Sequence, residues 1–203
     1  MRRDVSTQPL KQRFEHLLAG ISSSRFLEME GLNNEVPFFI CPYAPAEAVE
    51  MERLQRQLIS SLSQKGIQVL EINLYDLCIE LLKERDIWEQ VLEIESTVSK
   101  AEFKELLQGV FDPADNLIPA MSAKIAEKSF GVMFLTGIGE VFPYIRSHNV
   151  LNNLQRAAKD WPTLMFFPGT YSHSAATGTS LDLFGKLHDD KYYRAYNIYH
   201  REP

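Results

Sequence analysis

The sequence predicts a three-layer α/β fold with a mostly parallel sheet of five strands. Five short apolar runs have the length and composition of strands, at 37–41, 67–74, 130–136, 163–168 and 192–199. Segments with helical periodicity separate them, and this alternation favours a parallel sheet with helices on both faces. No repeat or low-complexity linker divides the chain, so we expect a single α/β domain over residues 1–203.

The first expected elements are a helix and a buried strand. In the N-terminal helical segment, residues 1–30, an apolar stripe ends at Gly20 and consists of Leu10, Phe14, Leu17 and Leu18. This spacing predicts a short amphipathic helix. The run "PFFIC" at 37–41 predicts a buried strand ahead of a proline-rich turn.

A longer helix and the second strand follow. Pro45 opens a predicted helix over about 46–65, and Gly66 closes it. The positions expected to face inward are Met51, Leu54, Leu58 and Leu62. "IQVLEINL" at 67–74 then predicts the second strand.

Residues 75–128 predict a helical insert, broken near "FDPADN" at 111–116. Its acid-rich part, "ERDIWEQVLEIES", is typical of a solvated helix with one apolar side. Beyond the insert, "FGVMFLT" and "TLMFFP" predict two further strands, and "YYRAYNIY" at 192–199 alternates as a half-exposed edge strand does.

The order of strands and helices resembles a P-loop core, but the nucleotide motifs are missing. A phosphate-binding loop of that type needs glycines and a lysine after the first strand. The segment "CPYAPAEAVE" has neither, and it places two prolines and Glu47 there. "TGIGE" follows the third strand instead, where a tight turn with a positive φ at Gly137 or Gly139 explains it. We therefore predict a degenerate P-loop-like core that binds no cofactor.

The composition, 45% hydrophobic and 24% charged, is that of an ordinary globular protein. No apolar run nears the roughly 20 residues that span a bilayer, and the first ten residues lack the apolar centre of a signal peptide. We therefore expect a cytoplasmic location and no membrane contact. Cys41 and Cys78 lie among apolar residues and are expected to be reduced core thiols.

The net charge of −6 is distributed unevenly. Residues 1–140 carry 14 basic and 22 acidic side chains, whereas residues 141–203 carry 7 and 5. An acidic protein gains little from the release of phosphate counterions, so direct nucleic-acid binding is disfavoured. A local basic face in the last third is still compatible with these numbers.

Three loops are expected at the carboxyl ends of the strands, which is where parallel sheets usually bind ligands. In one of them Glu140, Arg146 and His148 offer an acid, a guanidinium and an imidazole for general acid–base catalysis. The alternative is a Glu140–Arg146 pair that braces the loop, with Ser147 capping a helix that begins near Asn149. The spacing favours the structural interpretation.

Other chemistry has weaker support. "HDD" at 188–190, together with His148 and His173, supplies metal-ligand atoms, but a polar turn explains the same residues and we expect no metal. Cys41 has no histidine nearby in the sequence, and apolar neighbours raise the pKa of a thiol, so a nucleophilic role is disfavoured.

Tyrosine and arginine side chains on these loops and on the last strand favour a partner surface over an active site. The predicted partner-binding residues are Phe142, Tyr144, Arg146, His148, Tyr171, Tyr193 and Arg194. No catalytic residue is assigned.

Several motifs together resemble the BrxB family, a small component of bacteriophage exclusion (BREX) defence systems. They are "LTGIGEVFPYIRSHNVLNNLQ", "FFPGTY" and "LDLFGKLHDDKYYRAYNI", and the resemblance extends over nearly the whole chain. One departure is "SHSAATGTSLDLFG", which is longer than the short "PGxYxG" connection of the family. Contacts carried by that loop therefore do not transfer.

The resemblance implies a non-catalytic accessory protein that works with other BREX proteins in blocking phage DNA replication and in methylating host DNA. The partner it implies is PglZ, the alkaline-phosphatase-like component. A second hypothesis, from the core architecture, is a residual nucleotide- or nucleic-acid-binding sensor that does not hydrolyse its ligand.

Overall fold

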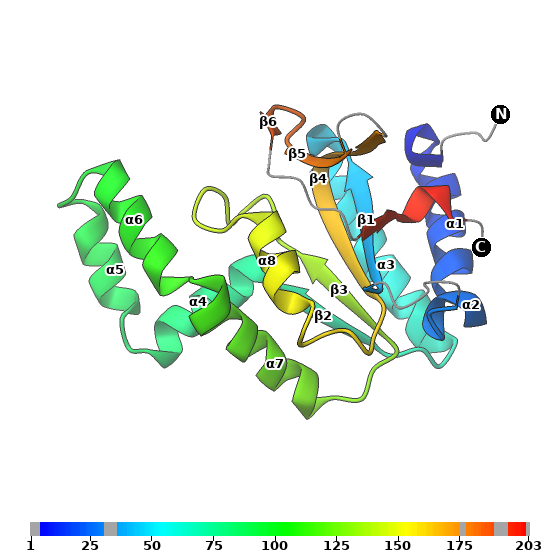
Figure 1. Ribbon diagram of the computed structural model, residues 1–203, viewed down its shortest axis with the longest axis horizontal. Coiled ribbons are helices and arrows are strands. Elements are labelled where there is room, and N and C mark those ends of the chain that lie inside the picture. Colours follow the sequence, from blue (N-terminus) through cyan, green and yellow to red (C-terminus); the bar gives the residue numbers. More distant parts are fainter. Residues whose placement is uncertain (1–4, 31–35, 175–177, 189–194, 202–203) are drawn as a thin grey trace.

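Five parallel strands form the centre of the computed structural model, which describes residues 5–30, 36–174, 178–188 and 195–201 (Figure 1). They run in the order β2-β3-β4-β1-β7. Their bounds are β1 Phe38–Tyr43, β2 Val69–Asn73, β3 Val132–Thr136, β4 Thr163–Ser174 and β7 Ala195–Asn197. All five predicted strands are therefore present, and β7 is an edge strand as expected.

The central strands are apolar on both faces because helices cover both. In β1, Phe38 and Ile40 face one hydrophobic core, and Phe39 and Cys41 face the other. β3 alternates in the same way. A strand buried on both sides is a continuous apolar run rather than an alternating one, which explains the sequence signal.

The helices divide between the two faces (Figure 1). One face carries α1 Leu10–Ile21, α2 Ser24–Leu27 and α3 Ala48–Gln64. The other carries α4 Leu74–Glu84, α7 Ile118–Glu127 and α8 Ser147–Leu154. Two further helices, α5 Trp88–Glu95 and α6 Lys100–Val110, extend from this second side at one end of the molecule (Figure 1).

Local signals in the sequence set the ends of several elements. Gly66 follows α3 with a φ of 80°, a left-handed conformation that ends helices and suits glycine. Asn73 caps α4, its side chain accepting from the backbone N–H groups of Tyr75 and Asp76. The break predicted near 111–116 is a short π-helix, Pro113–Leu117, between α6 and α7.

The sequence did not predict how β4 continues. Beyond Pro168 this strand runs on to Ser174 and pairs antiparallel with β5, Gly178–Leu183, which in turn pairs with β6, Leu187–His188. These residues are mostly polar, so they lack the apolar run that marked the other strands. Among the described residues, no helix has the length and apolar character needed to cross a membrane.

Candidate functional site

Connections after β1, β2 and β3 meet at the carboxyl edge of the parallel sheet, and they differ in how they are filled. β1 leads through a short 3-10 helix, Pro45–Glu47, into α3. β2 passes directly into α4, and β3 leads through residues 137–146 into α8. The side chains of these connections therefore surround one region of the surface.

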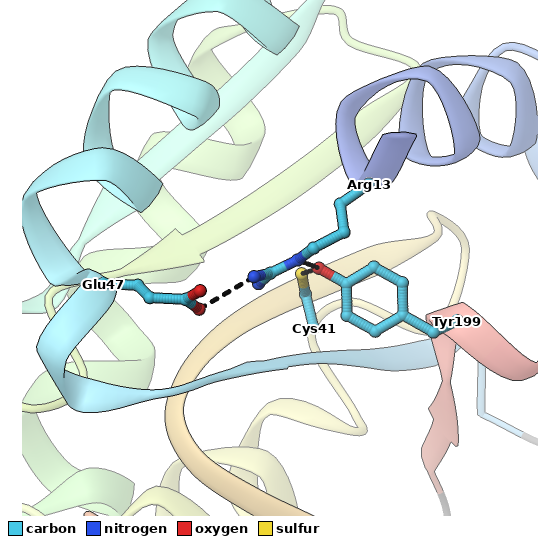
Figure 2. Close-up of polar contacts among 4 residues, drawn as sticks. All are labelled: Arg13, Cys41, Glu47 and Tyr199. Atoms are coloured by element: carbon cyan, nitrogen blue, oxygen red, sulfur yellow. Dashed lines mark hydrogen bonds and ion pairs between the residues drawn. The ribbon is translucent and has the colours of Figure 1, made fainter. Parts of the chain in front are cut away.

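A buried polar cluster fills the space beside the connection after β1 (Figure 2). Arg13 is only 1% exposed; its Nη1 lies 2.8 Å from Glu47 Oε2. The Arg13 Nε–H donates to the hydroxyl oxygen of Tyr199 at 3.2 Å, and the Cys41 thiol donates to the same oxygen at 3.2 Å. The cluster joins α1, β1, the start of α3 and the C-terminal 3-10 helix, Ile198–His200.

The protonation states in this cluster favour a structural role over a catalytic one. Burial raises the pKa of the Cys41 thiol to about 12, so the thiolate needed for nucleophilic attack does not form near neutral pH. Burial alone would lower the pKa of the Arg13 guanidinium, but the hydrogen bonds to Glu47 and Tyr199 raise it overall. Arg13 is therefore a fixed positive charge that holds three segments together.

The connection after β3, residues 137–146, carries two half-buried aromatic rings, and only Glu140 and Arg146 are exposed. Gly137 opens it with a φ of 72°, so the positive φ predicted for one of the two glycines is confirmed. Phe142 packs edge-on against Phe184 with ring centroids 6.3 Å apart, and the Arg146 guanidinium lies 5.9 Å from the Phe142 ring centroid. We call residues 138–146 the aromatic loop.

Two contacts attach the aromatic loop to α6. Tyr144 meets Phe103 edge-on with centroids 6.4 Å apart, and Gln108 Nε2 donates to the Pro143 carbonyl at 3.2 Å. These contacts fix the position of the α5–α6 pair relative to the sheet edge. The aromatic loop and the helical insert therefore form one continuous surface.

The predicted partner residues are only partly brought together. Phe142, Tyr144 and Arg146 share the aromatic loop, with Arg146 exposed and the two rings half-buried. His148 is 7% exposed, on the side of α8 that faces the core. Tyr171 lies on β4, where its hydroxyl donates to the Ala195 carbonyl at 2.6 Å. Tyr193 and Arg194 lie outside the described residues.

The start of α8 differs from the prediction that Ser147 caps a helix beginning near Asn149. The helix begins at Ser147 itself, and Arg146 occupies the cap position without a side-chain cap hydrogen bond. Ser147 is buried, with 5% of its surface exposed, and it is the first residue of α8.

An acidic pocket of about 610 Å³ lies between the starts of α3 and α4 and the ends of β2 and β3. Its carboxylates are Glu52, Glu71, Asp76, Glu80 and Glu140, against the cations Arg56 and Lys124. Arg56 pairs with Glu52, and Lys124 Nζ lies 2.6 Å from Glu80 Oε2. Thr136 Oγ1 donates to Glu71 at 3.1 Å. The pocket is therefore net negative.

Partial burial and the excess of negative charge raise the pKa of the Glu140 carboxyl above its ordinary value. Burial is the larger cause, and repulsion from Asp76 and Glu52 adds to it. Among the described residues no ion pair neutralises Glu140 or Asp76. A bound cation at this point would be stabilised, whereas a polyphosphate would be repelled.

An apolar groove of about 170 Å³ lies on the other side of Glu140. α4, α5, α6 and the aromatic loop form its walls, and its apolar lining includes Ile79, Leu82, Trp88, Leu92, Phe103 and Tyr144. Glu140 lines both the groove and the acidic pocket, so the two hollows adjoin.

Sequence reasoning missed both hollows, although one signal was available. Asp76 and Glu80 stand one turn apart on the helix that follows β2, and Glu52 stands on the helix that follows β1. Acids in the first turns of helices at a sheet's carboxyl edge are expected to converge. Among the described residues, no group of three or more histidine, cysteine or acidic side chains has a geometry that could hold a metal ion.

Two comparisons with known proteins match one family. The family model described as BREX protein BrxB matches residues 70–198. A BREX protein BrxB of Bacillus cereus (strain H3081.97) is 32% identical over 199 residues, covering 93% of this chain and 97% of that relative. A BREX protein BrxB of Escherichia coli O9:H4 (strain HS) is 28% identical over 189 residues, covering 93% and 91%. No solved structure gives a significant match.

Proposed function

This chain belongs to the BrxB family and is thus a component of a BREX phage-defence system, and from that premise we propose that it acts as a non-catalytic adaptor. Its contact surface is the carboxyl edge of the sheet, made of the aromatic loop and the walls of the adjoining groove. The proposed partner is another BREX protein, with PglZ the first to test. The proposed location is the cytoplasm, where phage DNA replicates.

One observation carries this proposal: exposed apolar side chains gather at the carboxyl edge. Five large hydrophobic side chains are exposed among the described residues: Val49, Tyr75, Leu92, Leu106 and Phe184. Val49 lines the acidic pocket, Tyr75 and Leu92 line the apolar groove, and Phe184 packs against Phe142. Scattered exposed hydrophobics are ordinary, but a concentration beside a charged rim is typical of a protein-binding surface.

The non-catalytic part of the proposal rests on the chemistry of the same edge. Both thiols are held protonated, since burial raises the pKa of Cys41 and of Cys78 to about 12. The pocket carboxylates have ion-pair or hydrogen-bond partners at Glu52, Glu71 and Glu80. Among the described residues, Asp76 and Glu140 have no ion-pair partner, and these negative charges support recognition of a cationic partner group.

The test is co-purification of BREX proteins with the tagged chain from cells carrying the whole defence operon. We expect the double variant Tyr144→Ala, Arg146→Ala to lose the partner and phage restriction while it stays folded, with an unfolding midpoint lowered by loss of the Tyr144–Phe103 contact. The matched control, Lys11→Ala with Arg53→Ala, alters exposed side chains on the α1–α3 side and should keep both. A double variant that restricts phage normally would show that this surface is the wrong one.

Variants of the pocket carboxylates separate a binding role from a catalytic one. In an adaptor, restriction and partner binding fall together as the surface is changed. A variant at Glu71, Asp76 or Glu140 that keeps full partner binding but abolishes restriction would argue for a catalytic role instead.

The sensor hypothesis has its own measurement. Calorimetric titration with ATP, GTP and short DNA or RNA should give no heat of binding, because the carboxylates that line the pocket at the sheet edge outnumber its cations, Arg56 and Lys124. Saturable binding at millimolar ligand or below would favour the sensor over the adaptor.

A further inference from the structure

The groove is walled by helices rather than by a free sheet edge. α4, α5 and α6 supply most of its lining, and the aromatic loop supplies the rest. Helical backbones already use their own hydrogen bonds, so a partner cannot dock here by adding a strand. What the groove offers is side-chain contact, which is how amphipathic helices are recognised.

Hydrophobic side chains line the groove without filling it. Leu92 is 45% exposed and Tyr75 is 47% exposed, both at its margin, while Leu82 and Leu107 form buried parts of its lining. Burying these partly exposed side chains against apolar side chains of a partner would contribute favourable free energy of binding. The floor is already packed, so binding requires little rearrangement.

The charge around the groove is predominantly negative, although Lys83 lies beside it, with its Nζ 5.8 Å from the ring centroid of the lining residue Trp88. The ionised side chains in its lining are the carboxylates Glu95 and Glu140. Residues 75–111, which form three of its walls, carry nine acidic and four basic side chains. Beyond Glu140 lies the acidic pocket, where Asp76 adds a further carboxylate.

We propose that this groove binds an amphipathic helix of the partner, with apolar side chains against Leu92 and Tyr75 and a lysine or arginine beside Glu140. The inference rests on the proposed adaptor function and specifies its ligand: a basic amphipathic helix rather than an extended or acidic segment. Charge complementarity selects this occupant, because an acidic helix would meet Glu95, Glu140 and Asp76 with like charge. The raised pKa of Glu140 supports the assignment, since a cation there relieves the existing repulsion.

Two exposed leucines of the α5–α6 pair give a matched test. Leu92 lines the groove, whereas Leu106, 36% exposed on α6, does not. Each position is replaced by a photo-crosslinking amino acid in the full chain, produced with the whole operon, and crosslinked peptides are identified by mass spectrometry. We expect position 92 to capture a partner segment with apolar residues at i, i+3 or i+4 and i+7 and with lysine or arginine beside them. Position 106 should capture no such segment.

Binding measurements complete the test. Against the purified partner, Leu92→Lys and Glu140→Arg should each weaken affinity by about tenfold or more, and Leu106→Lys should leave it within about twofold. Equal effects at 92 and 106 would overturn the groove assignment and leave the adaptor proposal standing. Capture of an acidic or extended segment, or of a second copy of this chain, would also overturn it.

A synthetic probe separates failure of the inference from failure of the adaptor proposal. If no BREX protein co-purifies, the adaptor proposal fails, and a designed leucine–lysine amphipathic peptide is then titrated into the chain. Binding that Leu92→Lys weakens and Leu106→Lys preserves would support the groove's chemistry on its own. Absence of binding, or equal binding of a matched leucine–glutamate peptide, would remove that support as well.

Discussion

The connections after β1 and β3 leave the same edge of the sheet but end in opposite surroundings. Beside the first, the protein's own side chains fill the space: Arg13 is buried between Glu47 and Tyr199, and Cys41 donates to the same tyrosine. Beside the second, Phe142, Tyr144 and Arg146 border an apolar groove and an acidic pocket. We call these the closed and the open half of the edge.

The difference shows that two connections at one sheet edge can present different chemistry. A phosphate site would need free backbone N–H groups after β1, but that space holds prolines, a glutamate and an internal ion pair. The open half keeps unneutralised carboxylates at Asp76 and Glu140 beside exposed apolar side chains, a combination that favours a cationic partner segment. We therefore expect stability to depend most on the closed half and, under the adaptor proposal, partner recognition to depend on the open half.

Removing Arg13 should break the closed half and gives the largest expected effect. Arg13→Ala empties a fully buried site and leaves the Glu47 carboxylate and the Tyr199 hydroxyl without their partner, so we expect a loss of about 3 kcal/mol. Urea unfolding measures it. The control is Arg56→Ala, which removes the exposed pair with Glu52 and should cost about 0.5 kcal/mol or less. Similar losses in both variants would mean that burial adds nothing to the Arg13 pair.

Gly137 lies at the base of the open half and should give a smaller loss. A Cβ at this position would lie 2.2 Å from Asn73 Oδ1, and the φ of 72° is strained for alanine. Gly137→Ala therefore displaces the cap of α4 as well as straining the turn, at a cost of about 2 kcal/mol. Gly109→Ala is the control, because a Cβ there meets nothing within 4 Å in α6 and should be neutral or slightly stabilising. A neutral Gly137→Ala would show that the turn adapts.

Glu140 should give the smallest effect, and the size of that effect depends on pH. Because the pKa of its carboxyl is raised in the folded state, the charged form costs stability at neutral pH, and the cost disappears as pH falls through the folded pKa toward 4.5. Glu140→Gln should raise the thermal midpoint by about 1 °C at pH 7 and by less near pH 4.

The matching control for Glu140→Gln is an exposed glutamate on α1, Glu15→Gln. If Glu140 contributes to partner binding, Glu140→Gln should slightly increase the stability of the protein and decrease its affinity for the partner. A variant that loses stability at pH 7 would contradict the repulsion assigned to Glu140.

The parallel strands could be predicted from the sequence because each one is marked by a pattern in its own residues. The run from Val132 to Leu135 is apolar throughout, since helices cover both of its faces, and Gly66 marks a helix end through its own backbone preference. The antiparallel extension of β4 was not predicted, because its sequence has no such local signal. Its pairing with β5 depends on residues that carry no apolar alternation.

Contacts between distant segments could not be predicted in the same way. Arg13 is typical of an exposed helix position in sequence, yet it is buried because Glu47 and Tyr199 converge on it from 34 and 186 residues away. The aromatic loop was predicted as a contact surface from its composition, and whether it binds a partner stays a prediction. The groove and the acidic pocket arise from packing between helices, which residue types alone do not specify.

The position of β1 has a consequence for biosynthesis. Its two neighbours, β4 and β7, both come from the last quarter of the chain, and Tyr199 completes the Arg13 cluster only at the end. At ordinary translation speeds, β1 leaves the ribosome on the order of ten seconds before either neighbour. A chain truncated after α8 would keep this apolar strand with both edges unpaired, a state prone to aggregation. The strand order therefore leaves β1 without either neighbour for most of the chain's synthesis.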